Sequence, residues 1–190
     1  AGGPRLRGRH DKEMNPLISV IIPNRNGSAF IGKCLEAVFS SDCEDFEVIV
    51  VDDCSGDGSV KLIRKFPCRL IRLERHSGAS RARNVGAYNS RGTVLFFTDA
   101  DCLVRKDTLT LVERAIARNG PGVIVGGTYT KEPLDADFYS RFQSAFIHYS
   151  ETKRAENPDY LASHAMAIDA EIFRKSGGFT ENFLPIIEDV

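Results

Sequence analysis

Residues 94–101 read VLFFTDAD and place two acidic residues directly after a continuous apolar run. A run without polar alternation is typical of a strand that is buried on both faces of a sheet. In an extended chain, residues i and i+2 point the same way, so Asp99 and Asp101 can both face one cation. The stretch predicts a buried strand that ends in a turn able to bind Mg²⁺ or Mn²⁺. The competing interpretation is a turn or helix N-cap with solvated acids.

Similar apolar runs recur on both sides of this stretch, at residues 18–22, 48–51, 70–73 and 123–125. Between them, apolar residues follow helical spacing within residues 30–38, 60–66 and 109–116. Strand and helix alternate about every 25 to 30 residues, which predicts an α/β fold with a Rossmann-like, mostly parallel central sheet flanked by helices. The ligand crevice of such a sheet lies at the carboxyl ends of its strands.

Size and composition indicate a soluble globular protein. The chain has 190 residues, of which 42% are hydrophobic and 27% charged, and its formal net charge is −1. These values predict a single domain over residues 16–190. A charge so close to zero does not attract nucleic acid, so no nucleic-acid partner is expected. Basic residues gather within residues 1–15, which we interpret as a flexible, solvated tail.

The five cysteines are scattered, and none has the C-x-x-C spacing of zinc or redox sites. We interpret them as reduced packing thiols, which favours a cytoplasmic protein. The sequence shows neither a signal-peptide pattern nor an apolar stretch approaching about 18 residues. A membrane anchor outside this chain is compatible with these patterns and would hold the domain at the cytoplasmic face of a membrane.

A second acidic pair, Asp52 and Asp53, follows another apolar run. A carboxylate at this position can accept the N3 proton of a uracil ring. The turn that follows leads into a helix that Asp57 or Ser59 can cap, and capping alone is the competing interpretation of the acids.

Three further segments combine polar residues with turns. Residues 23–27, PNRNG, close the first apolar run and can line a base-binding slot. Residues 77–84, SGASRARN, open a helix, and helix starts and arginines both suit a diphosphate, although an exposed basic helix face is the alternative. Glu188 and Asp189 follow GGF at residues 177–179, and taken alone they predict a solvated acid pair.

Together and in this order, the five segments resemble the family-2 glycosyltransferases, which have the GT-A fold. The resemblance implies a GT-A domain with a nucleotide-sugar-binding half at residues 16–127 and an acceptor-side half at residues 128–190. It implies inverting transfer of a sugar from a nucleoside-diphosphate sugar, UDP-sugars favoured, to a hydroxyl of a glycan, lipid-linked or other acceptor. The corresponding process is glycan or polysaccharide synthesis.

The resemblance also implies a role for each motif. Asp99 and Asp101 would bind Mg²⁺ or Mn²⁺, with Asp101 as the direct ligand. Asp189, beside Glu188, would take the proton of the acceptor hydroxyl, while Arg83 and the metal stabilise the departing diphosphate. The donor-binding residues that the resemblance implies are Pro23, Asn24, Arg25, Asn26, Asp52, Asp53, Gly78, Arg81, Arg83, Asn84, Asp99 and Ala100.

Two features depart from the family pattern. The family often has an asparagine before its M/L-A-x-R/K segment, whereas this chain has His164 there. His164 either faces the acceptor or is a structural histidine. The chain also stops one residue after Asp189, where the family continues into a further helix, which predicts a C-terminally truncated chain.

Three alternatives stay open. A sugar-1-phosphate nucleotidyltransferase shares the layered design but needs a glycine-rich basic loop after the first strand, and the single Gly27 there argues against it. A nucleotide-sugar-binding module without turnover would keep the same motifs. The chain is also compatible with an incomplete fragment of a membrane-linked transferase.

Overall fold

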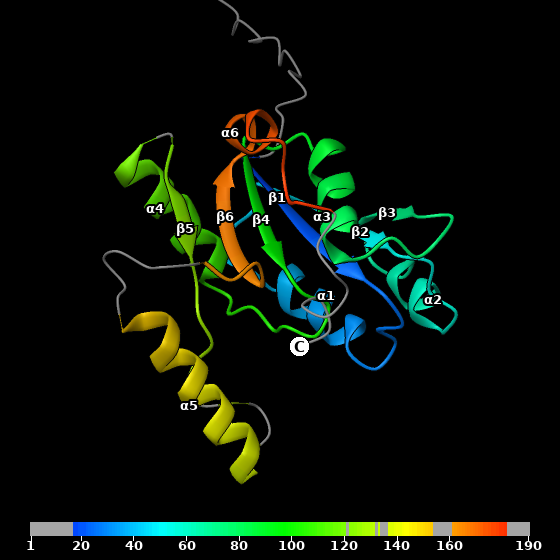
Figure 1. The fold of residues 1–190 in the computed structure, drawn as a ribbon, viewed down its shortest axis with the longest axis horizontal. Helices are drawn as coiled ribbons and strands as arrows, with labels where there is room; N and C mark the ends of the chain where they lie inside the picture. Colours follow the sequence, from blue (N-terminus) through cyan, green and yellow to red (C-terminus); the bar gives the residue numbers. More distant parts are fainter. Residues whose placement is uncertain (1–16, 121, 132, 134–136, 154–160, 182–190) are drawn as a thin grey trace, which may run out of the picture.

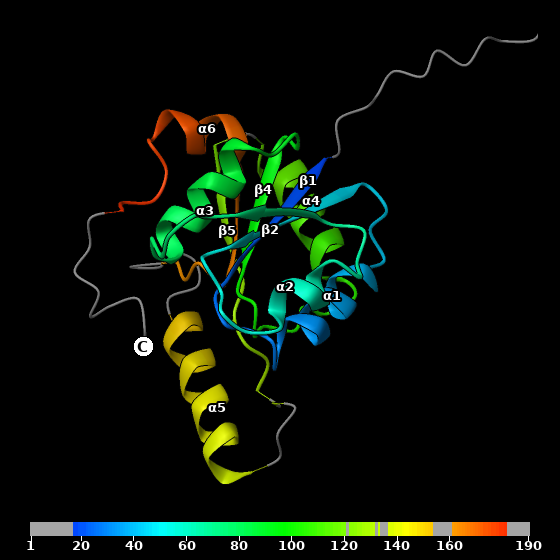
Figure 2. The same ribbon diagram turned by 90° about the vertical axis from the view of Figure 1, so that its right-hand side faces the viewer.

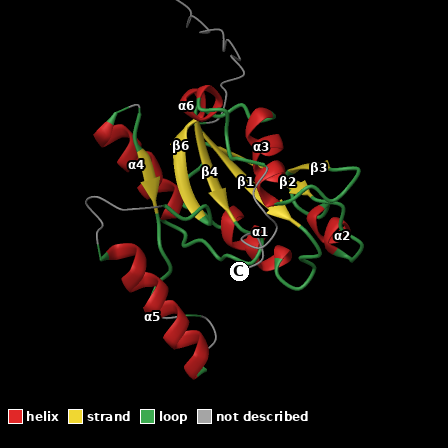
Figure 3. Cartoon of the chain, in the orientation of Figure 1, coloured by secondary structure: helices red, strands yellow, loops and turns green. Residues whose placement is uncertain are grey.

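The computed structural model describes residues 17–181 except 121, 132, 134–136 and 154–160. These residues form six strands and six helices (Figures 1 and 3). The strands are β1 (Ile18–Asn24), β2 (Phe46–Asp52), β3 (Arg69–Arg72), β4 (Val94–Thr98), β5 (Ile124–Gly126) and β6 (Ala165–Asp169). The helices are α1 (Ile31–Phe39), α2 (Ser59–Ile63), α3 (Ala79–Tyr88), α4 (Thr108–Asn119), α5 (Phe138–Thr152) and α6 (Ala170–Lys175).

All of these strands join one sheet in the order β3-β2-β1-β4-β6-β5. Strand β1 pairs in parallel with β2 and β4, and β2 pairs in parallel with β3. Strand β6 runs antiparallel to both β4 and β5. The sheet is therefore mostly parallel, as the sequence predicts, and the carboxyl ends of β1, β2 and β4 meet at one edge.

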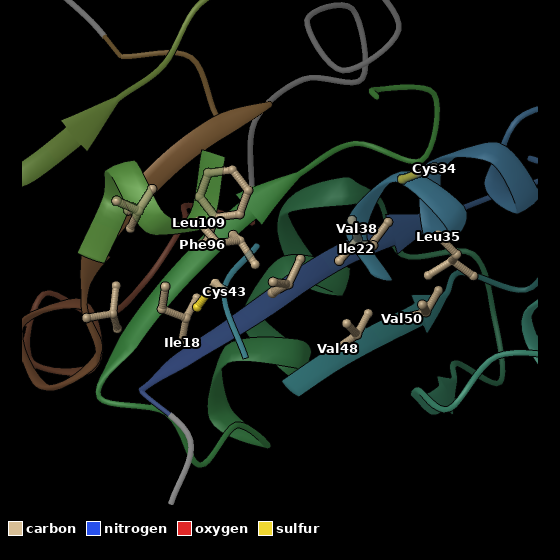
Figure 4. Close-up of a cluster of buried hydrophobic side chains, with 14 of the residues drawn as sticks. Ile18, Ile22, Cys34, Leu35, Val38, Cys43, Val48, Val50, Phe96 and Leu109 are labelled. Atoms are coloured by element: carbon tan, nitrogen blue, oxygen red, sulfur yellow. The ribbon is translucent and has the colours of Figure 1, made fainter. Parts of the chain in front are cut away.

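Two helix layers cover the sheet (Figure 2). On one face, Ile22 and Phe96 pack in a cluster with residues of α1, α2 and α4 (Figure 4). On the other face, Ile21 and Phe97 pack with residues of α3 and α6. Because successive residues of a strand point to opposite faces, burial on both faces explains why the strand sequences are continuously apolar.

Capping residues set the ends of several helices. The Asp169 carboxylate accepts hydrogen bonds from the backbone N–H groups of Glu171 and Ile172 at the start of α6. Helix α4 ends at Gly120, whose φ of 78° lies in the left-handed region that glycine adopts without strain. These local signals place both helices where their apolar residues face the sheet.

The region after Gly127 differs most from expectation. Residues Ala165–Asp169, for which the sequence predicts no element, form strand β6, which inserts between β4 and β5 in the reverse direction. A five-residue run is too short for its period to separate strand from helix, which is why the sequence left it unassigned. The aromatic stretch that follows β5 forms α5, which protrudes from the body of the molecule (Figures 1 and 2).

The cysteines are all free, and Cys34, Cys43 and Cys102 are buried, as expected for packing thiols. Within the described part of the chain, every helix is too short or too polar to cross a membrane. The predicted tail at residues 1–15 lies outside the described residues. So do the predicted catalytic base, Asp189, and the neighbouring Glu188.

Candidate functional site

A hollow of about 520 Å³ opens at the carboxyl ends of β1, β2 and β4. This size is within the range of small-molecule sites. The loop after β1, the start of α3 and the turn after β4 bound it. Ten residues predicted from the sequence line the hollow, namely Pro23, Asn24, Arg25, Asn26, Asp53, Gly78, Arg83, Asp99, Ala100 and Asp101.

Hydrogen bonds from Asn24 brace the first wall of the hollow. Its buried Nδ2 donates to Asp52 Oδ1 at 2.9 Å and to the hydroxyls of Ser55 and Ser59. Asp52 also accepts from the Ser55 backbone N–H at 3.2 Å. Its side chain is fully buried and does not line the hollow, which differs from the expected donor contact. Internal donors engage this carboxylate, so Asp52 positions the wall from behind.

The turn after β1 is tied to the loop after β2. The Asn26 backbone N–H donates to Ser55 Oγ at 2.9 Å, and the Ser28 N–H donates to Asp57 Oδ2 at 2.9 Å. Asp57 also accepts from the hydroxyl and the backbone N–H of Ser59. The pKa of Asp57 therefore lies well below its usual range; the Ser59 hydroxyl is the largest cause, burial acts in the opposite direction, and the backbone donors lower it further. Asp57 thus accepts a hydrogen bond from the first backbone N–H of α2, whose N-cap position is occupied by Gly58.

Asp53 holds the segment that enters α3. Its Oδ1 accepts from the Ser77 backbone N–H at 2.7 Å, and its Oδ2 lies 2.9 Å from the Gly78 N–H donor and 2.7 Å from His76 Nδ1. The Asp53 side chain is only 4% exposed, whereas that of His76 is 51% exposed. A nucleobase N–H would therefore share an oxygen with these donors or displace the His76 ring. The contact between Asp53 and a base stays a prediction.

Arg83 joins α3 to the turn at residues 99–102 after β4, which we call the acidic turn. Its Nη2 donates to Asp99 Oδ1 at 2.6 Å, and its guanidinium carbon lies 5.8 Å from the centre of the Phe179 ring. The Arg83 Nε is buried and has no hydrogen-bond partner among the described residues. A buried donor without a partner costs free energy. Because Arg83 lines the hollow, an oxygen-rich anion bound there is a natural partner for its guanidinium.

The acidic turn is the candidate metal centre. Ligand atoms of Asp99, Asp101 and Cys102 lie within 4.8 Å of one another. Burial raises the pKa of Cys102 to about 11, partly offset by the hydrogen bond with Tyr129, and the charges of Asp101 and Asp99 raise it further. A thiol suits softer metal ions, whereas the two carboxylates are hard oxygen donors that suit Mg²⁺ or Mn²⁺. Arg83 engages Asp99, which leaves the exposed Asp101 as the better placed ligand.

Most of the sequence matches the model of one known family. The model of the family described as glycosyl transferase family 2 matches residues 19–177, which include the residues that line the hollow and all of the sheet except Ile18. The chain belongs to glycosyl transferase family 2.

Three similar proteins illustrate the family and the fold. The glycosyltransferase AglE of Haloferax volcanii is 36% identical over 152 residues, which cover 73% of this family 2 chain and 49% of AglE. The structure of residues 1–349 of Staphylococcus aureus TarS with UDP-GlcNAc aligns with a TM-score of 0.71 at 22% identity, over 90% of this chain and 50% of that TarS chain. The mannosyltransferase PcManGT of Pyrobaculum calidifontis was solved with GDP-Man and Mn²⁺. It aligns with a TM-score of 0.68 at 23% identity, over 88% of this chain and 48% of the PcManGT chain. The fold is therefore GT-A, and the chain spans about half the length of each.

Two predicted donor residues of this family 2 chain face away from the hollow. Arg81 pairs with Glu181 at 3.2 Å. The buried Asn84 donates from Nδ2 to Phe179 O and Glu181 Oε1, both at 2.8 Å, and its Oδ1 accepts from the Phe179 N–H at 2.8 Å. Neither residue lines the hollow, because α3 turns them toward the segment after Gly178. They hold that segment, whereas the expectation was contact with the diphosphate.

His164 of the family 2 chain lies on the other side of the acidic turn. Its ring stacks on Tyr129 with ring centres 4.4 Å apart, and its Nε2 lies 3.8 Å from Glu151 Oε1 of α5. The Tyr129 hydroxyl lies 3.5 Å from Cys102 Sγ, and His148 Nδ1 lies 2.8 Å from the Tyr129 carbonyl oxygen. His164 therefore links α5 to the acidic turn, and a contact with an acceptor stays a prediction.

The sequence prediction missed two residues of the hollow, His76 and Phe30. The short β3 run ends just before His76, and its position ahead of Ser77 and Gly78 was the signal that could have identified it. Phe30 was assigned only to the apolar face of α1, but it precedes that helix and its side chain is 56% exposed. An exposed aromatic residue directly after a loop that lines the hollow could have been recognised as part of the site.

Proposed function

We propose that this family 2 chain carries the donor site of a glycosyltransferase that moves a sugar from a nucleoside-diphosphate sugar, UDP-sugars favoured, to an acceptor hydroxyl. The observation that carries the proposal is the meeting of Asp101, Arg83 and the start of α3 in one hollow. A diphosphate is bound by arginine side chains, helix N-termini and divalent cations, and this hollow offers a place for all three. The nucleotide-sugar complexes of TarS and PcManGT support the assignment.

Asp101, with Asp99 beside it, is the proposed site for Mg²⁺ or Mn²⁺. When bound, the ion supplies Lewis-acid stabilisation of the charge on a departing diphosphate. Arg83 adds a positive charge beside the Asp99 carboxylate, and its Nε is buried without a partner among the described residues. The chain thus presents positive charge where the leaving group becomes more negative.

The nucleoside is proposed to lie between the turn after β1 and the segment that Asp53 holds. Asn26, Asp53 and His76 offer polar groups to the edge of a base, and the exposed Phe30 ring offers a face for stacking. The internal hydrogen bonds of Asn24 and Asp57 keep these walls in place before the nucleotide arrives, which lowers the entropic cost of binding.

The transfer step is proposed to use Asp189, with Glu188 beside it. Asp189 takes the proton from the acceptor hydroxyl as its oxygen attacks the anomeric carbon opposite the diphosphate, which inverts the anomeric configuration. The proposal rests on the order of motifs, with the acidic pair following Gly177, Gly178 and Phe179. In the structure, Asn84 holds Phe179, whose ring centre lies 5.8 Å from the guanidinium carbon of Arg83, a residue that lines the hollow.

The acceptor is proposed to be a glycan, a lipid-linked molecule or another alcohol in glycan or polysaccharide synthesis. The proposed location is the cytoplasm or the cytoplasmic face of a membrane, with membrane association through sequence outside this chain. Residues 16–127 are proposed to serve the donor and residues 128–190 the acceptor.

Calorimetry with UDP, GDP and dTDP, each with and without Mn²⁺, tests the donor site. We expect one nucleotide to bind only with Mn²⁺, and Asp101→Ala to weaken that binding by at least about 100-fold, since even partners of metal ligands cost about 10- to 100-fold. Asp42→Ala, a matched change at an exposed position in another part of the chain, should leave binding unchanged. Absence of binding for every nucleotide, or unchanged affinity in Asp101→Ala, would refute the proposal. Binding without transfer to any acceptor would favour the non-catalytic module.

A further inference from the structure

Phe179, in the segment after α6, contacts the arginine of the hollow from outside the hollow. Its ring meets that of Phe97 edge-on, with ring centres 5.0 Å apart, and lies 5.4 Å from the Phe173 ring. The guanidinium carbon of Arg83 lies 5.8 Å from the centre of the Phe179 ring. A guanidinium within about 6 Å of a ring centre is attracted to the face of the ring. Phe179 therefore connects the aromatic cluster of the core to Arg83.

Asn84 fixes the place of Phe179. Its Nδ2 donates to the Phe179 carbonyl oxygen, and its Oδ1 accepts from the Phe179 backbone N–H, both at 2.8 Å. Asn84 is only 2% exposed, so water competes little for these hydrogen bonds. Gly178 permits the close approach, because a Cβ there would lie 2.6 Å from Asn84 Oδ1 and its φ of 76° lies in the left-handed region. The Phe179 backbone is thus tied to α3 at the residue next to Arg83.

The Arg83 guanidinium consequently has two anchors. Its Nη2 donates to Asp99 Oδ1 at 2.6 Å, and the Phe179 ring lies against the group. The Arg83 side chain is 12% exposed, and its Nε is buried with no hydrogen-bond partner among the described residues. Burial of an unpaired donor is unfavourable, so other contacts must hold the side chain in this position. The ion pair with Asp99 and the ring of Phe179 are such contacts.

We propose that Phe179 is a positioning residue of the donor site, which holds the Arg83 guanidinium in the orientation that binds the diphosphate. Phe179 does not line the hollow and acts through Arg83, which does. An arginine that is already oriented loses less rotamer freedom when an anion binds. The contact therefore raises the affinity for the diphosphate and leaves the binding of the nucleoside unchanged. This inference rests on the proposed function, because it concerns the diphosphate of the same donor.

The ratio of diphosphate to nucleoside affinity separates this role from simple packing. Calorimetry at saturating Mn²⁺ measures UDP, GDP and dTDP, and displacement titrations measure uridine, guanosine and thymidine. For the nucleotide that binds, we expect Phe179→Leu and Phe179→Met to lower the ratio about 5- to 30-fold, the range for a largely desolvated cation–π contact. Both variants keep an apolar side chain and lose the ring. Phe179→Tyr keeps the ring and should retain the ratio.

Phe173→Leu is the matched control for the loss of a ring. Phe173 belongs to the same cluster and is 3% exposed, but of the three rings it is that of Phe179 over which the guanidinium lies. Phe173→Leu should lower the thermal unfolding midpoint at least as much as Phe179→Leu and leave the ratio unchanged. In an Arg83→Met background, Phe179→Leu should have no further effect on the ratio, because its action passes through the guanidinium.

Three outcomes would overturn the inference alone while nucleotide binding persists. These are an unchanged ratio in both ring-free Phe179 variants, an equal fall of the ratio in Phe173→Leu, and a full effect of Phe179→Leu in the Arg83→Met background. The second would assign the effect to packing, and the third to a route that does not involve Arg83. If the parent chain binds none of the three nucleotides, the donor site itself is refuted, and this inference with it.

Discussion

The two sides of the acidic turn differ in how many hydrogen bonds hold their loops in place. On the side of the hollow, Asn24, Asp53 and Asp57 bind neighbouring loops through short hydrogen bonds before a ligand is present. On the other side, the hydroxyls of Thr98 and Thr128 have no partner among the described residues. Asn24 Oδ1 and Arg83 Nε also lack partners on the side of the hollow, so what distinguishes that side is the set of hydrogen bonds that hold its loops in place.

Packing beneath the hollow holds α3 tightly against the sheet. A Cβ at Gly86 of α3 would lie 2.5 Å from Ile21 Cγ2 and 3.2 Å from Val51 Cγ2. We expect Gly86→Ala to lower the free energy of unfolding by about 1–2 kcal/mol, because overpacking costs about 1–3 kcal/mol and alanine's helix propensity returns up to about 1. Urea unfolding measures the change.

Gly32→Ala in α1 is the matched control, because a Cβ at Gly32 meets nothing within 4 Å. It should raise the free energy of unfolding by up to about 1 kcal/mol through helix propensity alone. If both variants gain stability, α3 can move away from the sheet at little cost, and the hollow is less rigid than its packing indicates.

The hydrogen bonds that Asp57 accepts from the neighbouring loops predict that the stability of the fold depends on pH. Hydrogen bonds, that from the Ser59 hydroxyl first, hold the pKa of Asp57 well below its usual range. Its contribution to stability is thus present above the unfolded pKa of about 4 and is lost as the pH falls through the folded pKa. Asp57→Asn should lower stability at pH 7, and its difference from the parent should shrink toward pH 2. The effect is at most about 1 kcal/mol, because the carboxylate is exposed to solvent.

Urea unfolding at pH 7, 4 and 2.5 measures that difference. Asp42→Asn removes the same charge at an exposed position for which the described residues offer no side-chain partner, and it isolates the loss of the loop contacts. A difference for Asp57→Asn that grows toward low pH would mean that the ionised carboxylate opposes the folded loop.

The sequence predicted the strands that border the hollow better than it predicted β6, and the reason is physical. Strands such as β1 and β4 are buried on both faces, so their runs are unambiguous, and the polar residues that follow them converge at one edge by topology. Strand β6 could not be recognised in five residues, because neither its length nor its period separates it from a helix. Its reverse direction depends on pairing with β4 and β5, which local sequence does not encode.

Within the site, the motifs predicted which segments meet but not which side chains face the hollow. Asp53 and Arg83 line it, whereas Asp52 and Asn84 turn away to bind their neighbours. Adjacent acids such as Asp52 and Asp53 are equivalent in a motif, and only the direction of each side chain at the strand end separates them. His76 was missed because a single histidine in a loop forms no pattern of its own, and only its position ahead of Ser77 and Gly78 relates it to the site.

The smallest expected effect on the free energy of unfolding concerns α5. It tests whether this helix stabilises the folded core. Phe142 is 59% exposed and touches Phe138 and Phe146 one turn away on either side, with ring centres 6.5 and 6.2 Å apart. Contacts of this kind contribute about 0.2–0.5 kcal/mol, and alanine is the better helix former, so the two effects of Phe142→Ala nearly cancel. We expect a change within about 0.5 kcal/mol in the free energy of unfolding.

Phe97→Ala is the matched control for the same loss of an aromatic ring. Phe97 is fully buried against Phe173 and Phe179, with ring centres 5.2 and 5.0 Å away, and its loss should cost about 3–5 kcal/mol. A cost above about 1.5 kcal/mol for Phe142→Ala would show that a partner surface covers α5 in solution. In that case the unfolding midpoint should depend on protein concentration if the partner is a second copy of the chain, since association stabilises only the folded state.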